Sequence, residues 1–277
     1  MRPVCIVRHI TLSVLIILPL MAQSPKKPTT REMNLISWQE FREFVPEKIE
    51  TVLLPVGTLE PHGVIPNGAD NLAPEAMARA IAERVNAMIA PTLNYGVTGT
   101  LKAYPGAFAI SEAAYRPFIA DILKGLAENG FKNIIILNGH GGPQTAILRS
   151  EADKASEKYR VRILVINWWS LTLEDTKEIF GENGGHAGNN ETAYIQAIVP
   201  EHVHPERYSR DMTTAYPSGT SWYATPFPSS IGLYEKGQGY PTFDEQQAKE
   251  FFRRVNDRVA ALIEEVIAKW DRAGLYR

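Results

Sequence analysis

Cysteine is almost absent from this chain of 277 residues, and the single one, Cys5, lies close to the N-terminus. Disulfides therefore do not hold the fold together, because no second thiol is available to form one. A chain of this length buries enough apolar surface to fold without such cross-links. The sequence thus predicts a globular protein that depends on an ordinary hydrophobic core.

An excess of one charge is also missing, since the formal net charge is only -2. No run of basic residues interleaved with aromatic residues occurs, so we expect no nucleic-acid partner. The chain is 44% hydrophobic and 22% charged, which is typical of a folded protein and too hydrophobic for a disordered one. The length allows one large domain or two small ones.

Long apolar runs are scarce, and the clearest one lies at the N-terminus. Arg2 and Arg8 precede an apolar run over residues 10–22 that contains no carboxylate. This run is short for a membrane span but suits a secretory signal, so we expect an exported protein, periplasmic or secreted, with no stable membrane partner. The alternative is an uncleaved N-terminal membrane anchor. The expected segments are a signal peptide over residues 1–22, a flexible linker over residues 23–33 and one folded domain over residues 34–277.

Apolar stretches of strand length alternate with stretches of helical spacing in the rest of the chain. We expect strands over residues 51–56, 88–93, 133–137 and 161–166, and helices over residues 37–44, 74–88, 111–129, 143–159, 192–199 and 244–270. Residues 201–240 are rich in Pro, Gly, Ser and Tyr, and we expect them to be irregular. Nearly continuous apolar strands indicate a parallel sheet that is buried on both faces. The predicted fold is α/β, a three-layer sandwich with a mainly parallel sheet covered by helices on both faces.

Two polar stretches follow predicted strands and carry side chains that bind metals. Glu60 and His62 lie just past the strand over residues 51–56, and His140 lies just past the strand over residues 133–137. Ligands of an open α/β sheet bind beyond the carboxyl ends of its strands, so these side chains are expected at one edge. Asp70 ends the loop that contains Glu60, and a carboxylate there could bridge two metal ions.

A third polar stretch adds His186 and Glu191. Imidazole and carboxylate ligands on separate loops suit a catalytic divalent ion, which lowers the pKa of its water from about 15.7 to about 7 and polarises a carbonyl. We expect His186 to move a proton onto the leaving nitrogen. The backbone N–H groups of Gly141 and Gly142 are expected to face the developing oxyanion.

Each of these residues also has a structural interpretation. A single His after a strand is usually a hydrogen-bonded structural residue, and Glu191 could be a first-turn carboxylate favoured by the helix dipole. The clustering of Glu60, His62 and Asp70 favours function over structure. Trp168 and Trp169 end a strand, and one could belong to the core while the other forms a pocket wall.

With these motifs, the chain resembles the creatininase family over residues 54–200. Residues 54–63 are similar to the opening signature, in which the Glu and the His are metal ligands, and Asp70 matches the Asp that bridges the metals. Asn138-Gly139-His140-Gly141-Gly142 is similar to the second signature, and His186-Ala187-Gly188 with Glu191 to the third. Trp169 falls where creatinine hydrolases pack a Trp on the substrate.

The resemblance implies a metal-dependent amidohydrolase that is usually a homo-oligomer, a hexamer, acting on a small-molecule amide. It implies one or two divalent ions per subunit, of which Zn²⁺ is the first expectation and Mn²⁺ or Fe²⁺ are alternatives. The metal ligands would be Glu60, His62, Asp70, His140 and Glu191, with His186 catalytic and Trp169, Gly141 and Gly142 at the substrate.

The sequence departs from creatinine hydrolases at Gly142, where those enzymes carry a Glu two positions after the His. Relatives with the glycine act on other substrates, including a formamide and a peptide. We therefore predict cleavage of a non-peptide C–N bond, in a cyclic amide, lactam or formamide, by a metal-bound hydroxide. The alternatives are an exported, non-catalytic binding protein that retains the metal pocket, and a lactone or sugar hydrolase that uses the same ions.

Overall fold

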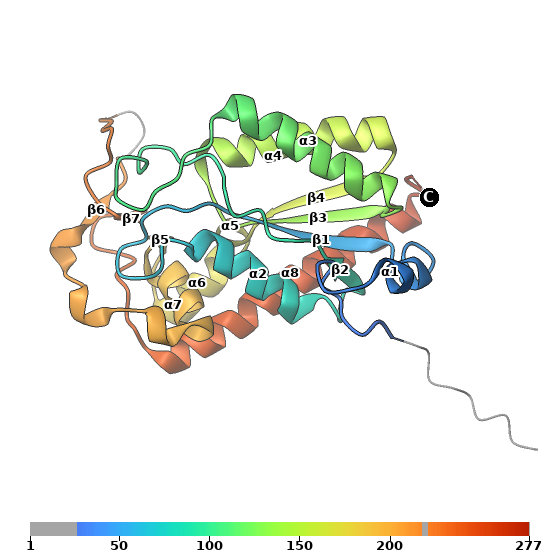
Figure 1. The fold of residues 1–277 in the computed structure, drawn as a ribbon. Helices are drawn as coiled ribbons and strands as arrows, with labels where there is room; N and C mark the ends of the chain where they lie inside the picture. Colours follow the sequence, from blue (N-terminus) through green and yellow to red (C-terminus); the bar gives the residue numbers. More distant parts are fainter. Residues whose placement is uncertain (1–26, 218–220, 277) are drawn as a thin grey trace, which may run out of the picture.

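A four-stranded parallel sheet forms the centre of the computed structural model, which describes residues 27–217 and 221–276 (Figure 1). The expected signal peptide lies outside these residues. The strand order is β2-β1-β3-β4. The strands are β1 (Thr51–Val56), β2 (Ala87–Ile89), β3 (Asn133–Asn138) and β4 (Arg162–Asn167).

Helices cover both faces of this sheet, so the predicted three-layer α/β fold is confirmed. The alternating side chains of β3 show how the layers form: Ile134 and Ile136 join the core under one set of helices, and Ile135 and Leu137 join the core under the other. The first set is α1 (Trp38–Phe44), α3 (Glu112–Glu128) and α4 (Gly142–Tyr159). The second set is α2 (Ala69–Ile81), α7 (Asn189–Ile198) and α8 (Glu245–Arg272).

A second, smaller sheet lies beyond the carboxyl ends of the main strands, in the order β5-β7-β6 (Figure 1). Its strands are β5 (Gly185–His186), β6 (Thr213–Ala215) and β7 (Ile231–Leu233), with β5 antiparallel and β6 parallel to β7. Residues 201–240 were expected to be irregular, which is wrong at β6 and β7. Strands of three residues are too short to show an alternating pattern in the sequence.

The boundaries of several other elements also differ from the prediction. Helix α2 begins at Ala69 and ends at Ile81, whereas the sequence placed its start at Pro74 and its end at Met88. Strand β2 covers only Ala87–Ile89, and α7 begins at Asn189 rather than Thr192. The short helices α5 (Trp168–Leu171) and α6 (Leu173–Phe180) were not predicted.

The edge of the sheet at β2 is covered by residues 31–33, which precede the first helix. The N–H of Met33 donates to the carbonyl of Ile89 (2.9 Å), and the N–H of Ile89 donates to the carbonyl of Arg31 (2.8 Å). These pairings satisfy backbone groups that an edge strand would otherwise expose. Among the residues that the structure describes, no helix combines the length and apolar character needed to cross a membrane.

Ile263 on α8 is fully buried in the core beneath the sheet, so its replacement should destabilise the fold. We expect Ile263→Ala to lower the free energy of unfolding by about 2–5 kcal/mol, because it removes buried methyl groups and leaves a cavity. Urea unfolding followed by circular dichroism measures this. Glu265→Ala, on the exposed side of α8, should cost less than about 1 kcal/mol. Equal losses in the two variants would contradict this packing.

Candidate metal centre

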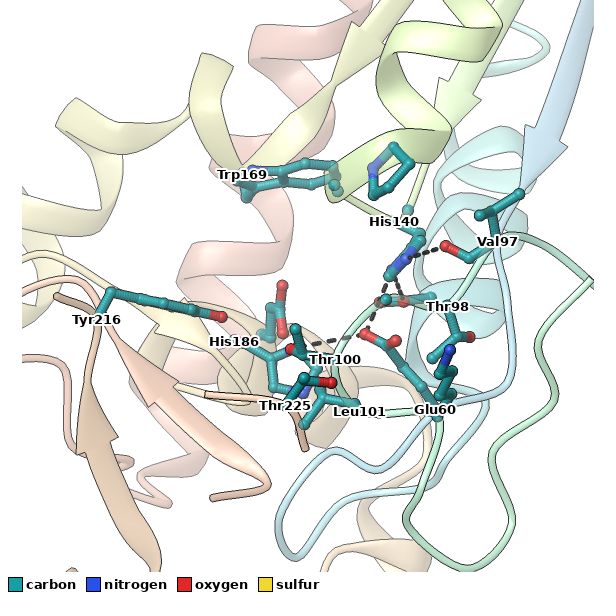
Figure 2. A pocket seen from close by; sticks show the side chains of 18 of the residues that line it. Glu60, Val97, Thr98, Thr100, Leu101, His140, Trp169, His186, Tyr216 and Thr225 are labelled. Atoms are coloured by element: carbon teal, nitrogen blue, oxygen red, sulfur yellow. Dashed lines mark hydrogen bonds and ion pairs between the residues drawn. The ribbon is translucent and has the colours of Figure 1, made fainter. Parts of the chain in front are cut away.

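Three carboxylates and three imidazoles converge where the main strands end. Figure 2 shows Glu60, His140 and His186 among them. Ligand atoms of Glu60, Asp70 and His140 all lie within 4.8 Å of one another, and so do those of Glu60, His62 and His186. Glu191 joins them, with its Oε2 atom 3.6 Å from His62 Nε2. The structure therefore brings together all six residues that were predicted from the sequence to bind metal or to transfer a proton.

Asp70 reaches this group because the first turn of α2 is wedged between the ends of β1 and β3. A Cβ atom at Gly57 or Gly139 would lie 2.2 Å or 2.0 Å from the backbone oxygen of Asp70, so only glycine fits at either position. Pro74, four residues along the helix, has no N–H to donate to that oxygen. The two glycines and the proline together allow the strand ends to approach the helix turn closely.

Each of the three histidines has one ring nitrogen directed to a backbone carbonyl. His62 Nδ1–H donates to the carbonyl of Glu60 (2.9 Å), His140 Nε2–H to that of Val97 (3.2 Å) and His186 Nε2–H to that of Pro61 (2.7 Å). A carbonyl accepts only from a protonated nitrogen, so these contacts fix the tautomers. In each ring, the other nitrogen faces the carboxylates, and it presents a lone pair to them only when that nitrogen is deprotonated.

The carboxylate of Asp70 lies between two of these rings. Its Oδ1 atom is 2.9 Å from His62 Nε2, and its Oδ2 atom is 2.9 Å from His140 Nδ1. His62 Nε2 is buried, and its contact with Asp70 does not have the geometry of a hydrogen bond. A carboxylate whose two oxygens face two different imidazoles has the arrangement of a ligand shared between two cations.

Burial and neighbouring charges shift the pKa values of the acidic residues in opposite directions. Burial favours the neutral form of Asp70, but His62 and His140 beside it hold the pKa of that carboxyl well below its usual range. Glu60 is likewise buried, and His140 and His186 lower its pKa. Burial raises the pKa of Glu191 to about 7, although His62 opposes this.

The pKa values of the three histidines are also shifted in opposite directions. Burial opposes the charged form of His62, but the charge of Asp70 raises its pKa to about 10. Glu60 and Asp70 raise the pKa of His140 well above its usual value despite burial. Burial and repulsion from His62 lower the pKa of His186 to about 4, so this ring is neutral at pH 7.

This donor set fits divalent cations. Once His62 and His140 lose their protons, the buried carboxylates of Glu60 and Asp70 and the largely buried one of Glu191, which is 13% exposed, have no buried positive charge beside them among the described residues. Burying such charge is costly without cations to balance it. Mixed imidazole and carboxylate donors suit Zn²⁺ or Mn²⁺.

Behind His140 lies a network of buried amides that the sequence analysis did not identify. Asn138 Nδ2 donates to the carbonyl of His140 (2.6 Å) and to Asn167 Oδ1 (2.8 Å). Gln144 Nε2 donates to Asn138 Oδ1 (3.2 Å), and Gln144 Oε1 accepts from the N–H of Val97 (3.1 Å), whose carbonyl orients His140. The available signal was a polar Asn at the end of each of two adjacent apolar strands, β3 and β4.

Five of the six clustered side chains, all except His62, line a cavity of about 780 Å³. Trp169, Gly141 and Gly142, which the sequence placed at the substrate, all line it. Trp168 belongs to the core instead, with 3% of its surface exposed. The cavity walls also include Tyr216, Tyr223 and Tyr234, from residues 201–240, where the sequence did not indicate which side chains face the pocket.

Comparison with known proteins agrees with this geometry. The family model described as creatinine amidohydrolase matches residues 34–263. The chain belongs to the creatininase family. This match confirms two predictions at the level of the family. The chain is a metal-dependent amidohydrolase of this family, and it is a hydrolase of C–N bonds other than peptide bonds.

Individual relatives are distant. A creatinine amidohydrolase of Pseudomonas putida is 26% identical over 191 residues, in an alignment that covers 62% of this chain and 73% of that protein. A 3-dehydro-scyllo-inosose hydrolase of Thermotoga maritima is 26% identical over 190 residues, which cover 65% of this chain and 60% of that protein. A solved creatinine amidohydrolase superposes with a TM-score of 0.75 at 22% identity, covering 86% of this chain and 98% of its own. The structural likeness establishes the fold.

The raised pKa values of His62 and His140 predict that cation binding displaces protons. Both rings are protonated at pH 7 in the metal-free protein, and a ligand nitrogen must be deprotonated, so affinity for Mn²⁺ should rise with pH. Calorimetric titrations in two buffers of different ionisation enthalpy should show release of about one to two protons per chain. Asp70→Asn should abolish tight binding. Binding without proton release would contradict these protonation states.

Proposed function

We propose that this protein is an amidohydrolase that cleaves the C–N bond of a cyclic amide with the help of two divalent cations, zinc or manganese. The observation that carries the proposal is Asp70, whose two oxygens each face a different histidine at 2.9 Å. Creatininases solved in a zinc form and in a manganese form superpose with a TM-score of 0.72 each, which supports the choice of metals.

The ligands divide between the two sides of Asp70. Glu60 Oε1 lies 3.3 Å from His140 Nδ1, so these two residues and Asp70 Oδ2 would hold one cation. His62 Nε2, Asp70 Oδ1 and Glu191 Oε2 would hold the other. Glu191 thus provides a carboxylate for this second cation, whereas Gly142 has no side chain to provide one. When bound, such ions acidify a water molecule and polarise the amide carbonyl.

His186 is the residue placed to move the proton. Its Nε2–H is held by the carbonyl of Pro61, and its Nδ1 atom is 3.6 Å from Glu60 Oε1, inside the cavity. Because the ring is neutral at pH 7, Nδ1 can accept a proton from the attacking water. The same proton then goes to the ring nitrogen of the substrate as the C–N bond breaks. This step leaves an amine and a carboxylic acid, and the acid releases its proton to become a carboxylate.

The backbone at the start of α4 completes the site. Gly141 and Gly142 line the cavity at the N-terminus of this helix, where the first N–H groups have no acceptor within the helix. Gly142 has a φ of 58°, which favours glycine over other residues. These donors and the positive end of the helix dipole would stabilise the negative charge that develops on the carbonyl oxygen.

The proposal is tested with the metal-loaded protein and a panel of creatinine, other cyclic amides, formamides and lactones. We expect turnover of at least one cyclic amide, and a loss of about 100-fold or more in kcat for His186→Ala, because that variant lacks the proton carrier. Its metal content should remain that of the wild type.

His204→Ala is the matched control, because the side chain of His204 is 43% exposed and lies outside this cavity. It should leave kcat unchanged. Loss of the cations from His186→Ala would make that residue a ligand rather than a proton carrier. Hydrolysis of lactones alone would favour the lactone or sugar hydrolase, and no turnover by a metal-loaded protein would favour the binding protein.

A further inference from the structure

The segment that carries β6 and β7 forms the wall of the cavity on the side opposite helix α4. This segment provides none of the six clustered carboxylates and imidazoles. Tyr216 follows β6 and lines the cavity together with Trp169 (Figure 2). In this view Tyr216 and Trp169 lie on different sides of the space above Glu60 and His186. Two aromatic side chains therefore border the region that a substrate must occupy.

Tyr216 is held in this position from several directions. Its N–H donates to the carbonyl of Leu233 (2.8 Å), which extends the pairing of β6 with β7. Its ring stacks on Phe227, with centroids 5.3 Å apart and an angle of 25° between the planes. A Cβ atom at Gly232 would lie 2.8 Å from the Tyr216 ring, so the glycine makes room for it.

Phe227, beneath that ring, is anchored in turn. It is buried, with 7% of its surface exposed. Its carbonyl accepts from the hydroxyl of Tyr104 (2.8 Å), and its N–H donates to the carbonyl of Thr100 (3.2 Å). Trp222 also stacks on Phe227, at 6.0 Å and 10°. The stack is therefore fixed to the loop over residues 94–111, which forms another part of the same cavity.

The exposed part of Tyr216 faces the cavity. Although its backbone and one ring face are fixed, 40% of the residue remains exposed, and its hydroxyl has no hydrogen-bond partner among residues 27–217 and 221–276. Glu191, Glu60 and Asp70 are close enough to affect its ionisation, and with burial they keep the phenol protonated by raising its pKa. The ring thus offers a flat, neutral surface near the reacting bond.

The size of the cavity indicates what this surface contacts. A volume of about 780 Å³ is in the range that holds a drug-sized ligand, and a single small ring such as creatinine fills only a fraction of it. We propose that Tyr216 is a specificity-determining residue, and that the substrate carries, beside the amide that reacts, a second flat ring that packs on Tyr216. This inference rests on the proposed function, because it assumes that the amide lies at the cations.

Two hydroxamates that share a metal-binding head test the inference. Acetohydroxamate offers the head alone, and benzohydroxamate adds a flat ring to it. Calorimetry with the manganese-loaded protein should give benzohydroxamate a dissociation constant at least about tenfold lower, because the ring gains apolar and stacking contacts. Tyr216→Ala should remove about tenfold of that preference and leave acetohydroxamate binding within about twofold of the wild type.

Two further variants separate the ring from other effects. Tyr216→Phe keeps the ring and should keep the preference for benzohydroxamate. Tyr95→Ala removes an exposed tyrosine that does not line the cavity, and it should change neither dissociation constant. Unchanged acetohydroxamate binding in Tyr216→Ala also reports that this variant is folded and loaded.

The outcomes distinguish a failure of the proposed function from a failure of the role assigned to Tyr216. Failure of both hydroxamates to bind a protein that holds its cations would overturn the proposed function, and this inference with it. If both bind but the wild type shows no preference for benzohydroxamate, or Tyr216→Ala shows the same preference as the wild type, the proposed function stands and the role of Tyr216 is wrong.

Discussion

The position of the Asp70 carboxylate, buried between His62 and His140, is the constraint on which the site depends. It requires the first turn of α2 to enter between the ends of two adjacent parallel strands, β1 and β3. Gly57 and Gly139 leave room for the backbone of Asp70, and Pro74 leaves its carbonyl without a helical donor. Larger side chains at these glycines would move the carboxylate away from both imidazoles, so strand packing and metal binding depend on the same residues.

Three helix N-termini also point to this region, which helps to explain why acidic groups collect there. Asp70 lies in the first turn of α2, Glu191 lies in the first turn of α7, and α4 begins beside His140. The positive ends of helix dipoles stabilise negative charge, each by about 0.3–1 kcal/mol at exposed sites and more where burial reduces screening. Such contributions are small beside the cost of burying three carboxylates. In the metal-free protein, the positive charges of protonated His62 and His140 offset that cost, and bound cations would replace these protons.

The sequence predicted which carboxylates and imidazoles come together because a general rule applied to them. Polar side chains that follow buried parallel strands meet at one edge, and this rule alone brought Glu60, His62 and His140 together. A third polar stretch added His186 and Glu191, and the resemblance to a known family supported the same residues. Asp70 was placed at the end of a loop because Pro74 is typical of a first helical turn, whereas tertiary packing extends the helix back to Ala69. The glycines that permit this extension act only through contacts that no local pattern reveals.

The cavity wall could not be predicted for a different reason. Tyr216 and Phe227 lie in a segment without helical or strand periodicity. Its short strands are defined by the pairing of β6 with β7 and of β7 with β5, which lies outside the segment. Likewise, Gln144 reaches Val97 across the fold and has no signal in its neighbours. Local sequence therefore indicates which groups can react, and the long-range contacts decide what shape of molecule reaches them.

Anomalous diffraction from crystals of the manganese-loaded protein tests the central claim most directly. The account predicts two ordered peaks that flank Asp70, one contacting Glu60 and His140 and the other contacting His62 and Glu191. Ordered manganese that does not contact Asp70, in crystals where the six side chains keep the arrangement described here, would contradict it.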